Sequence, residues 1–557
     1  MNIYSIFSAL FLFSTTISAH VLTHLEHKDL QLLTAYADGP ALVDKISRTK
    51  TRVGRDYFAQ QLCTPLIDAE QLRQRQETVQ LFLNNQPFYQ NALQELELFS
   101  EHQSALHSLP HDNNTCKKLL QRFYFKNKYT KWLNSYPAGL ECGQLLQITS
   151  LFAPVIEHAV IHFLVNEKLH SYLGMCCLHS HHKHHKHKHA EPSLLAQCAY
   201  YAYNIAHGAI HIMSCKELLE HVYQQYSVIR EMQQFLSHIR TCLQVRGRLY
   251  QQLRAYPEFA HIISEQELSS ECKEFINLVI QDTSLLGAYQ AMRPGTILRA
   301  YALFDSVQDE LFQYCKPVAL IDFYYSIATL YKEYNATQTP YNFCNYHPTT
   351  QLEVDGFWNP LFSESQPIDF TMTAGNTDPS CVIVTGQNKA GKSTNLYAIA
   401  VCIVMGQSLG IAPAKYCAFS PFEHIFTGFN MPARVIEGAS LFTTTIAFTQ
   451  AVLQAAQLGK TLIILDELFS STHHVKGAAI AQTFLKSIAQ QTNAIALVST
   501  HLSSLAQLQI DHPDLFTTIM VERSEDDDEY CIKRGFLPVA EYEDSFDPEL
   551  LYTIDIL

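Results

Sequence analysis

Apolar and polar positions follow two different patterns along the chain. From about residue 20 to residue 340, apolar residues recur every three to four positions, which is the repeat of one face of an α-helix. This pattern predicts helices over residues 66–98, 193–212, 216–254 and 266–291. The chain is too long for one core, so we expect a long all-α domain over residues 20–345 and a second domain after it.

The second pattern begins near residue 350, where short apolar runs alternate with helical ones. The runs 381–385, 461–465 and 494–498 are typical of buried parallel strands, and the segments 392–409, 440–458 and 476–490 are typical of helices. Such alternation predicts an α/β domain with a doubly wound, mostly parallel sheet over residues 346–557. A hairpin is expected near its end, at residues 517–523 and 530–536.

The composition is that of a packed globular protein. Hydrophobic residues make up 47% of the 557 positions and charged residues 17%. The formal net charge of −14 argues against a protein coated with basic residues for nucleic acid, although a local basic surface is compatible with it. The 15 cysteines have no regular spacing, which indicates reduced, buried thiols.

The first nineteen residues have two interpretations. Residues 6–13 are apolar and a run of small residues ends at Ala19, as in a signal peptide, but no Lys or Arg precedes them. The alternative is an apolar helix or strand that covers the next domain. No other stretch reaches about 18 uninterrupted apolar residues, so no spanning helix is expected elsewhere.

Two basic features lie within the helical region. Residues 179–189 hold seven of the 27 histidines, and their alternation with lysines favours a solvated loop over a metal site. Five arginines stand among apolar positions of the segment 227–254, either on a solvated helix face or on a surface for a polyanion. They are Arg230, Arg240, Arg246, Arg248 and Arg254.

A glycine-containing loop follows the first predicted strand of the second domain and precedes its first helix. The run fits the motif G-x-x-x-x-G-K-S/T, in which backbone amides and the helix N-terminus face phosphate oxygens. Lys392 would reach the β- and γ-phosphates of ATP, and Ser393 would bind Mg²⁺. The candidate nucleotide-binding residues are Gly386, Gln387, Asn388, Lys389, Ala390, Gly391, Lys392, Ser393 and Thr394.

Polar residues also end the next two predicted strands. Asp466 and Glu467 follow one of them, and in P-loop enzymes such an Asp holds the Mg²⁺ while the adjacent Glu can polarise the attacking water. His501 follows the other, where a histidine can face the γ-phosphate. We therefore predict a Mg²⁺-dependent ATPase with Glu467 and His501 as catalytic residues, and with Ser393 and Asp466 as metal ligands. An ATP site favours the cytoplasm, while residues 1–19 leave export or membrane anchoring open.

The surroundings of these motifs resemble the MutS family of mismatch-repair ATPases. Residues 385–394 (TGQNKAGKST) are similar to the family's TGPNMGGKST, residues 466–472 (DELFSST) to its DEIGRGTS, and residues 499–501 (STH) to its ATH. Residues 437–442 (EGASLF) are similar to its GRSTF element, whose serine reaches the nucleotide of the partner subunit. The resemblance thus implies a homodimer through the ATPase domain, with Ser440 acting in trans.

Weaker similarity continues upstream. Residues 51–76 resemble the start of the family's lever domain, and residues 356–360 (GFWNP) resemble a ring-bearing segment that packs near adenine. Ala439 and Leu441, however, replace the Arg and Thr of GRSTF. Only about 30 residues separate Ala19 from Gly54, where the family's mismatch-reading domain would precede the levers. These departures argue against direct mismatch reading but not against ATP binding.

Three functions are open on this evidence. The first, which we expect, is a MutS-like homodimeric clamp on DNA, belonging to mismatch repair, whose levers are switched by nucleotide. The second is a MutS-related ATPase that acts on a protein or membrane partner without binding DNA, which the negative charge favours. The third is a transporter-type ATPase, but the chain has no LSGGQ-type run.

Overall fold

The computed structural model of the chain describes residues 21–534, except for 36–38, 108–112, 125–130, 141, 151, 154–155, 158–159, 161–162, 165–193, 257–258, 260–266, 282–293, 363–366, 387–389, 430–440, 468–473 and 524–529. The expectations for residues 1–19 and for the tract 179–189 fall outside this part. No helix within the described part is long and apolar enough to cross a membrane.

The chain divides into two compact units. Unit 1 contains the described residues of Met1–Glu97, Gln252–Ile263 and Pro317–Leu557, and unit 2 contains those of Leu98–Gln251 and Ser264–Lys316. The sequence pattern changes near residue 345, where we expected a domain boundary. The compact units instead divide near residues 97, 251, 263 and 316. The reason is that helical segments from both ends of the first region pack together with the α/β region.

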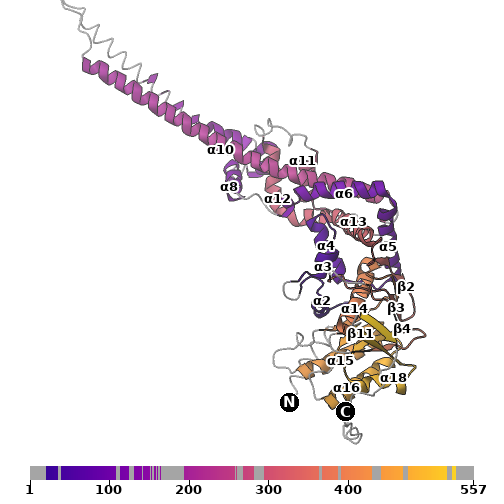
Figure 1. Cartoon of the computed structure of the whole chain (residues 1–557). Coiled ribbons are helices and arrows are strands. Elements are labelled where there is room, and N and C mark those ends of the chain that lie inside the picture. Colours follow the sequence, from indigo (N-terminus) through magenta and orange to yellow (C-terminus); the bar gives the residue numbers. More distant parts are fainter. Residues whose placement is uncertain are drawn as a thin grey trace, which may run out of the picture. The chain divides into compact units, whose positions relative to one another are not determined.

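Unit 1 contains a six-stranded sheet, of which Figure 1 labels β11. Its order is β12-β11-β5-β10-β9-β8, and all neighbouring strands are parallel except for β12, which is antiparallel to β11. The strands are β5 (Cys381–Gly386), β8 (His424–Gly428), β9 (Thr461–Asp466), β10 (Ala494–Ser499), β11 (Phe516–Arg523) and β12 (Tyr530–Arg534). The three predicted strands, the parallel sheet and the terminal hairpin are thereby confirmed, and β8 is an additional strand.

Three helices accompany this sheet, at or within two residues of their predicted bounds: α14 (Lys392–Leu409), α15 (Leu441–Leu458) and α16 (His474–Ala489). Phe448 of α15 and Phe484 of α16 pack in one buried cluster with alternate residues of β5, β9 and β10, such as Ile383, Ile463 and Ala496. The strand residues between them are also buried, and α14 contacts the same three strands. Burial of both sides of these strands explains their continuous apolar runs.

Smaller sheets lie beside the main one in unit 1. The four-stranded sheet has the order β2-β7-β3-β4, and a two-stranded sheet pairs β1 with β6. Their strands are β1 (Asn342–Phe343), β2 (Asn345–Tyr346), β3 (Gln351–Asp355), β4 (Thr371–Gly375), β6 (Ile411–Ala412) and β7 (Tyr416–Phe419). The alternating burial of β3 and β4 is typical of strands with one face toward the core.

The helices of unit 1 that precede its strands in sequence begin with α2 (His24–Asp29), α3 (Leu42–Ile46), α4 (Arg52–Cys63), α5 (Ala69–Asn84) and α6 (Gln86–His102), and α13 (Lys316–Tyr334) lies almost wholly within the unit. Two short helices, α17 (Ser503–Ala506) and α18 (Leu508–Asp511), follow β10. The helical pattern predicted over residues 66–98 is confirmed, but it comprises two helices, because α5 ends before Asn85 and α6 begins after it. Asn85 Oδ1 accepts a hydrogen bond from the Phe88 amide at 3.0 Å, and Pro87 suits a first helical turn.

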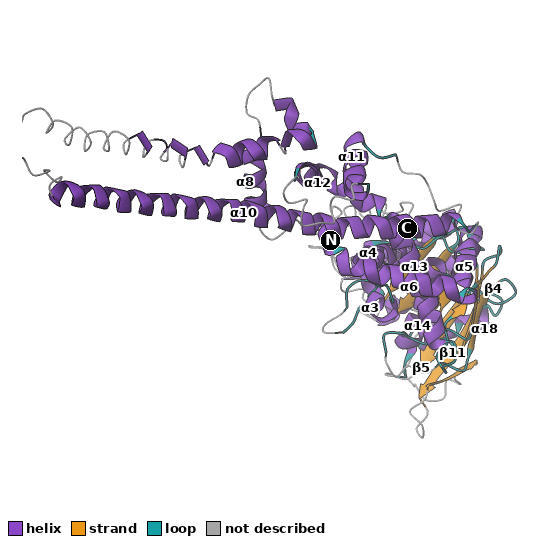
Figure 2. Cartoon of the chain, turned by 90° about the horizontal axis from the view of Figure 1, so that it is seen from above, coloured by secondary structure: helices purple, strands orange, loops and turns teal. Residues whose placement is uncertain are grey.

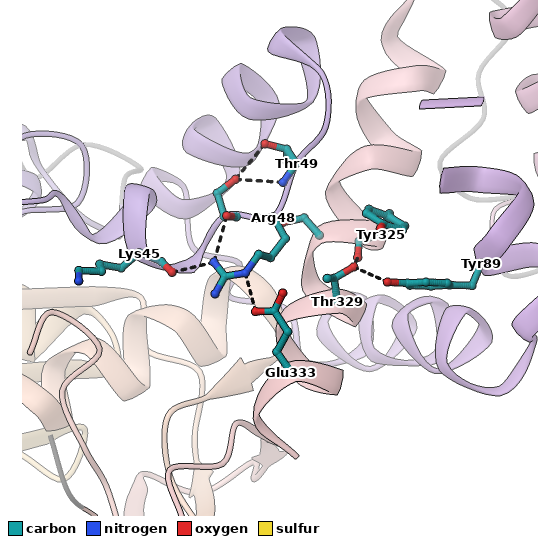
Figure 3. Close-up of polar contacts among 9 residues, drawn as sticks. Lys45, Arg48, Thr49, Tyr89, Tyr325, Thr329 and Glu333 are labelled. Atoms are coloured by element: carbon teal, nitrogen blue, oxygen red, sulfur yellow. Dashed lines mark hydrogen bonds and ion pairs between the residues drawn. The ribbon is translucent and has the colours of Figure 1, made fainter. Parts of the chain in front are cut away.

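Polar contacts join α13 to the segments before α4 and within α6 (Figure 3). Arg48 Nε donates to Glu333 Oε2 at 2.6 Å, and its Nη1 donates to the carbonyl of Lys45 at 2.8 Å. On another side of α13, the hydroxyl groups of Tyr89 and Thr329 lie 2.9 Å apart. The Arg48–Glu333 and Tyr89–Thr329 contacts connect residues 285 and 240 positions apart in sequence, so they cannot be predicted from local pattern.

A buried carboxylate fixes α13 to the start of α4. Asp322 is fully buried and accepts hydrogen bonds from the Lys50 amide (2.9 Å), the Thr51 amide (2.7 Å) and the Thr51 hydroxyl (2.7 Å). Burial raises the pKa of Asp322 to about 6, and these hydrogen bonds oppose that shift. Gly54 is required here, because a Cβ atom at this position would lie 2.0 Å from Asp322 Oδ2.

The C-terminal turns of α14 are tied to the junction between α4 and α5. Gln407 is fully buried, and its side-chain amide donates to the Leu66 carbonyl (2.9 Å) and the Phe422 carbonyl (3.0 Å). The Leu66 amide in turn donates to the Gln407 carbonyl at 2.8 Å. Arg75 of α5 also donates to the Ser408 carbonyl. The C-terminal end of α14 is therefore held against α4 and α5.

Unit 2 is helical in its described part. It contains α7 (Ser104–His107), α8 (Asn113–Phe123), the short η1 (Lys131–Ser135), α11 (Ser270–Ile280), α12 (Gly295–Tyr314) and all but the last three residues of α10 (Leu194–Arg254). The two helices predicted over 193–212 and 216–254 are one continuous helix, α10 (Figure 2). The intervening Ser214 and Cys215 are only mildly unfavourable in a helix and do not break it. In the core of unit 2, the ring of Phe304 packs against the rings of Phe235 and Phe275.

Candidate nucleotide site

The described ends of the glycine-containing loop have backbone conformations that favour glycine. Gly386 ends β5 with φ +144°, and a Cβ atom there would lie 2.2 Å from the Val521 carbonyl oxygen. Gly391 precedes α14 with φ +93°. Both angles lie in the region that side chains disfavour, so the two motif glycines are explained by the backbone. Gln387, Asn388 and Lys389 lie outside the described residues.

Lys392 opens α14 with a buried side chain. Its Nζ donates a hydrogen bond to the Gly386 carbonyl at 3.0 Å. Burial lowers the pKa of Lys392, while the nearby carboxylates of Glu467 and Asp466 raise it in opposition. The structure thus brings the end of β5, the start of α14 and the end of β9 to one place, as the motifs predict.

The residues that end β9 and β10 contact each other across the strand pair. Asp466 and Ser499 are direct register partners, and the Ser499 hydroxyl donates to Asp466 Oδ1. The amide of Glu467 lies 3.1 Å from Ser499 Oγ and 3.2 Å from its carbonyl oxygen. Glu467 has φ +51°, a left-handed conformation that costs a non-glycine residue energy and is common at functional sites. Ser499 therefore contacts both residues that end β9, although no sequence motif marks it.

His501 reaches Glu467 from the segment after β10. Its Nε2 lies 2.8 Å from Glu467 Oε1, and both side chains are partly exposed. Thr500 holds this segment, because its amide donates to the Val384 carbonyl (3.0 Å) and its hydroxyl accepts from the Leu502 amide (2.9 Å). The two predicted catalytic side chains are thus in direct contact.

A pocket of about 380 Å³ adjoins these residues within unit 1. Ser393 and Asp466, the two predicted metal ligands, both line it. Asp29 and Gln31 line it as well, although no sequence motif marks them. The full lining is Asp29, Gln31, Asn359, Leu361, Phe362, Ser393, Thr394, Tyr397, Phe429 and Asp466.

The segment that carries Asp29 is anchored to the sheet and to α14. Thr427 of β8 donates its hydroxyl hydrogen to Asp29 Oδ2 at 3.0 Å, and Tyr397 of α14 donates to the Leu30 carbonyl. The Ile425 amide donates to the Val21 carbonyl at 3.0 Å. Because these contacts join residues about 400 positions apart, the role of this segment in the pocket depends on tertiary structure.

The rings of segment 356–360 do not line this pocket. Phe357 and Trp358 are buried in the protein, and Trp358 packs against the rings of Tyr334 (5.8 Å) and Tyr341 (5.0 Å). Its indole Nε1 donates to the Pro340 carbonyl at 3.0 Å. The residues of this region that reach the pocket are instead Asn359, Leu361 and Phe362.

The donor atoms fit ATP with Mg²⁺. A hydroxyl and a carboxylate are hard oxygen ligands, which Mg²⁺ prefers, and a buried ammonium group beside them suits phosphate oxygens. Within the described residues, no group of three His, Cys, Asp or Glu side chains could hold a metal ion by itself. Ser440 lies outside the described part.

The arginines of segment 227–254 do not form one exposed row. Arg240 is buried and donates to the Ile280 carbonyl at 3.2 Å. The guanidinium of Arg246 lies over the rings of Tyr314 (3.7 Å) and Tyr250 (4.4 Å). The remaining three, Arg230, Arg248 and Arg254, are exposed. At most three of the five can therefore face a polyanion.

The described cysteines are free thiols, and most of them are buried as expected. Cys142 and Cys215 are exposed, which the expectation of buried thiols did not include.

The parallel sheet, the glycine turns and the strand-end carboxylates define a P-loop nucleotide-binding domain. Residues 382–538 match the family model of MutS domain V. The DNA mismatch repair protein Msh6 of Gallus gallus is 33% identical over 133 residues, which cover 24% of this chain and 10% of that protein. The DNA mismatch repair protein MutS of Carboxydothermus hydrogenoformans is 26% identical over 278 residues, covering 47% and 31%.

The human DNA mismatch repair protein Msh6 is 34% identical over 127 residues, which cover 23% of this chain and 9% of that protein. The chain thus spans less than a third of the length of these relatives. The matches show a MutS-like protein, with the similarity carried by its C-terminal half.

Proposed function

We propose that this MutS-like chain binds ATP at residues 386–394 and hydrolyses it with Mg²⁺ as cofactor. The convergence of Lys392, Asp466 and Glu467 supports this most directly, because a buried ammonium group beside two strand-end carboxylates suits a Mg²⁺–phosphate complex. We also propose the doubly wound arrangement for this domain, with α14 on one face of the sheet and α15 and α16 on the other. The need for ATP favours a cytoplasmic location.

Each side chain has a role in the proposed reaction. Lys392 exchanges its bond to the Gly386 carbonyl for bonds to phosphate oxygens. Ser393 and Asp466 would hold the Mg²⁺, whose charge would offset that of the phosphates. Glu467 orients and polarises the attacking water, and His501 holds the Glu467 carboxylate while facing the γ-phosphate.

We further propose that α14 transmits the state of the nucleotide site to the helical region. The helix begins at Lys392 and its far end is bonded to Leu66 and Arg75 through Gln407 and Ser408. A shift of α14 on nucleotide binding would therefore displace α4 and α5 with it. The family resemblance adds a homodimer through the ATPase domain, with Ser440 reaching the partner's nucleotide.

DNA is the proposed partner on which this ATPase acts. The helical region would hold the DNA as a clamp, and the process would be mismatch repair. The matched relatives are DNA mismatch repair proteins, which supports this choice. Filter binding of plain and branched duplexes at about 50 mM and about 200 mM salt, with and without ATP, tests it. We expect retention at low salt that falls steeply at high salt. No retention at low salt would exclude DNA as the load.

One observation supports a second candidate, an ATPase that acts on a protein or membrane partner without DNA. Residues 194–215 of α10 contain no Asp, Glu, Lys or Arg, so this part of the helix offers no cation to phosphates. Absence of DNA retention together with intact ATP turnover would favour this candidate.

A further inference from the structure

A buried acidic residue from the start of the chain lines the nucleotide pocket. Asp29 is the last residue of α2, is only 3% exposed, and borders the same pocket as Ser393 and Asp466. The phosphate-binding motif contains no acidic position, and the proposed reaction assigns Asp29 no role. Burial of a carboxylate costs free energy unless hydrogen bonds or a cation compensate for it. Asp29 therefore needs partners in or around the pocket.

The side chain of Asp29 is held in place by the main sheet. The hydroxyl group of Thr427, a fully buried residue of β8, donates a hydrogen bond to Asp29 Oδ2 at 3.0 Å. The Tyr397 hydroxyl donates to the carbonyl of the next residue, Leu30, and so fixes the backbone there. Because the threonine hydroxyl is an uncharged donor, its hydrogen bond orients the carboxylate without neutralising it. Asp29 is therefore a positioned carboxylate at the border of the pocket.

The elements that hold Asp29 also carry the two proposed Mg²⁺ ligands. Tyr397 stands four positions after Ser393, so both side chains lie on one face of α14. Thr427 stands on β8, whose neighbour in the sheet is β9, the strand that ends at Asp466. Asp29 is thereby connected to both sides of the site at which Ser393 and Asp466 would hold Mg²⁺.

Charge determines what Asp29 can do at this place. The carboxylates of Asp29 and Asp466 would both repel the phosphates of a metal-free nucleotide, whereas a divalent cation attracts all of these groups. Mg²⁺ takes few protein carboxylates directly and keeps several of its water molecules. Within the described residues, no three acidic, histidine or cysteine side chains lie close enough to bind one ion together. A further carboxylate at this site is therefore expected to act through water bound to the ion.

We propose that Asp29 is a positioning residue for the Mg²⁺ of the nucleotide site, whose carboxylate accepts hydrogen bonds from water bound to the ion. The assignment rests on the proposed binding of ATP at residues 386–394. It gives the N-terminal segment a share in the affinity for Mg²⁺–ATP, because Thr427 and Tyr397 hold Asp29 and Leu30 beside the pocket. Outer groups of this kind change the affinity of a protein for a metal by about 10- to 100-fold.

Binding of a non-hydrolysable ATP analogue, with and without the metal, tests this assignment. Adenylyl imidodiphosphate is titrated into the full-length protein by calorimetry, once in excess Mg²⁺ and once in EDTA. Asp29→Asn keeps an oxygen atom that accepts the Thr427 hydrogen bond but removes the charge. With Mg²⁺, we expect the affinity of this variant to fall by about 10- to 100-fold. In EDTA, its affinity should equal or exceed that of the natural protein, because one negative charge no longer repels the phosphates.

Two variants serve as controls. Asp369→Asn removes a carboxylate that is fully exposed and does not line the pocket, so both affinities should stay unchanged. Thr427→Val removes the hydrogen bond that anchors Asp29 and keeps the charge. It should weaken binding with Mg²⁺ less than Asp29→Asn does, and it should not strengthen binding in EDTA. A Thr427→Val protein that matches Asp29→Asn in both conditions would show that Asp29 only anchors its segment, and would overturn the proposal.

The remaining outcomes separate this proposal from the proposed function. If the natural protein binds the analogue in neither condition, the nucleotide site itself is contradicted, and the role of Asp29 with it. If the natural protein binds the analogue and Asp29→Asn has the same affinities in both conditions, only the role of Asp29 is overturned. An equal loss of affinity in Mg²⁺ and in EDTA also overturns that role, because it would place Asp29 at an uncharged part of the nucleotide.

Discussion

The imidazole of His501 lies 2.8 Å from the carboxylate of Glu467, measured from Nε2 to Oε1. The two residues follow neighbouring parallel strands, so the sheet itself brings them together. The backbone amide of Glu467 also contacts Ser499, and the backbone of Glu467 has a left-handed conformation. The backbone of Glu467 is thus fixed by Ser499, and its carboxylate is held by His501. This arrangement is suited to orient a single water molecule, since catalysis depends on accurate placement.

Replacing the loop lysine should strongly weaken nucleotide binding. Lys392→Ala removes a charge-assisted donor, and such hydrogen bonds contribute about 1.5–3 kcal/mol each, so affinity should fall by roughly 10- to 150-fold or more. Titration with a fluorescent ATP analogue in the presence of Mg²⁺ measures this loss. Lys476→Ala, which changes an exposed lysine of α16, is the control and should bind normally. Unchanged affinity of Lys392→Ala would place the phosphates elsewhere.

Replacing the strand-end glutamate should separate binding from turnover. Glu467→Gln keeps the shape of the side chain but cannot act as a base, so ATP should still bind while hydrolysis falls by about 10²- to 10⁴-fold. Steady-state phosphate release and equilibrium binding, measured on the same preparation, provide the two quantities. Glu353→Gln in β3, outside the pocket, should hydrolyse normally. Normal turnover by Glu467→Gln would remove its proposed role.

His501 should act through Glu467. His501→Ala is expected to reduce turnover by about tenfold, less than Glu467→Gln, because it only frees the carboxylate to move. In the double variant, the loss should be no larger than in Glu467→Gln alone. Phosphate release is measured for the natural protein, the two single variants and the double variant, which together form a double-mutant cycle. Additive losses would mean that the histidine acts on the substrate independently.

Stability should depend on pH through Asp322. Burial raises the pKa of this carboxyl to about 6 in the folded protein, above the ordinary value of 3.8, so the folded state holds its proton more tightly than the unfolded state. The free energy of unfolding should therefore fall as the pH rises from about 4 to about 6, by an amount on the order of 3 kcal/mol. Urea unfolding at several pH values measures this slope. The Asp322→Asn variant should be less stable at every pH, because the asparagine side-chain amide group would face the hydrogen-bond donors of Thr51. Its free energy of unfolding should no longer fall with pH through this position.

The close approach of Gly54 to Asp322 leads to a second prediction, about the effect of Gly54→Ala on the free energy of unfolding. In Gly54→Ala the new methyl group would lie 2.0 Å from Asp322 Oδ2, so unit 1 should be destabilised by about 1–3 kcal/mol or more. Gly247→Ala is the comparison, since no atom lies within 4 Å of a Cβ atom at that position of α10. There, the higher helix propensity of alanine should stabilise the protein by up to about 1 kcal/mol. Thermal unfolding followed by circular dichroism should show shifts of opposite sign.

Local pattern was sufficient wherever a segment's neighbours in sequence decide its structure. The helix predicted over residues 392–409 is α14, because its apolar residues, its initial glycine and the following Gly410 act within the segment. The buried strands β5, β9 and β10 were likewise visible as uninterrupted apolar runs. At Asn85, the signal for a helix break was present in the sequence and was outweighed by the continuing apolar repeat.

The sequence by itself determined which residues are the candidates for nucleotide binding, because the motif G-x-x-x-x-G-K-S/T requires Gly386, Gly391 and Lys392 at fixed spacing. Only the tertiary structure decided which distant residues join them. Asp29 reaches the pocket because β8 and α14 anchor its segment, and Trp358 is turned away because Tyr334 and Tyr341 surround it. Such contacts depend on the order of strands and on the packing of helices, and those depend on the whole chain at once, since burial is shared among residues far apart in sequence.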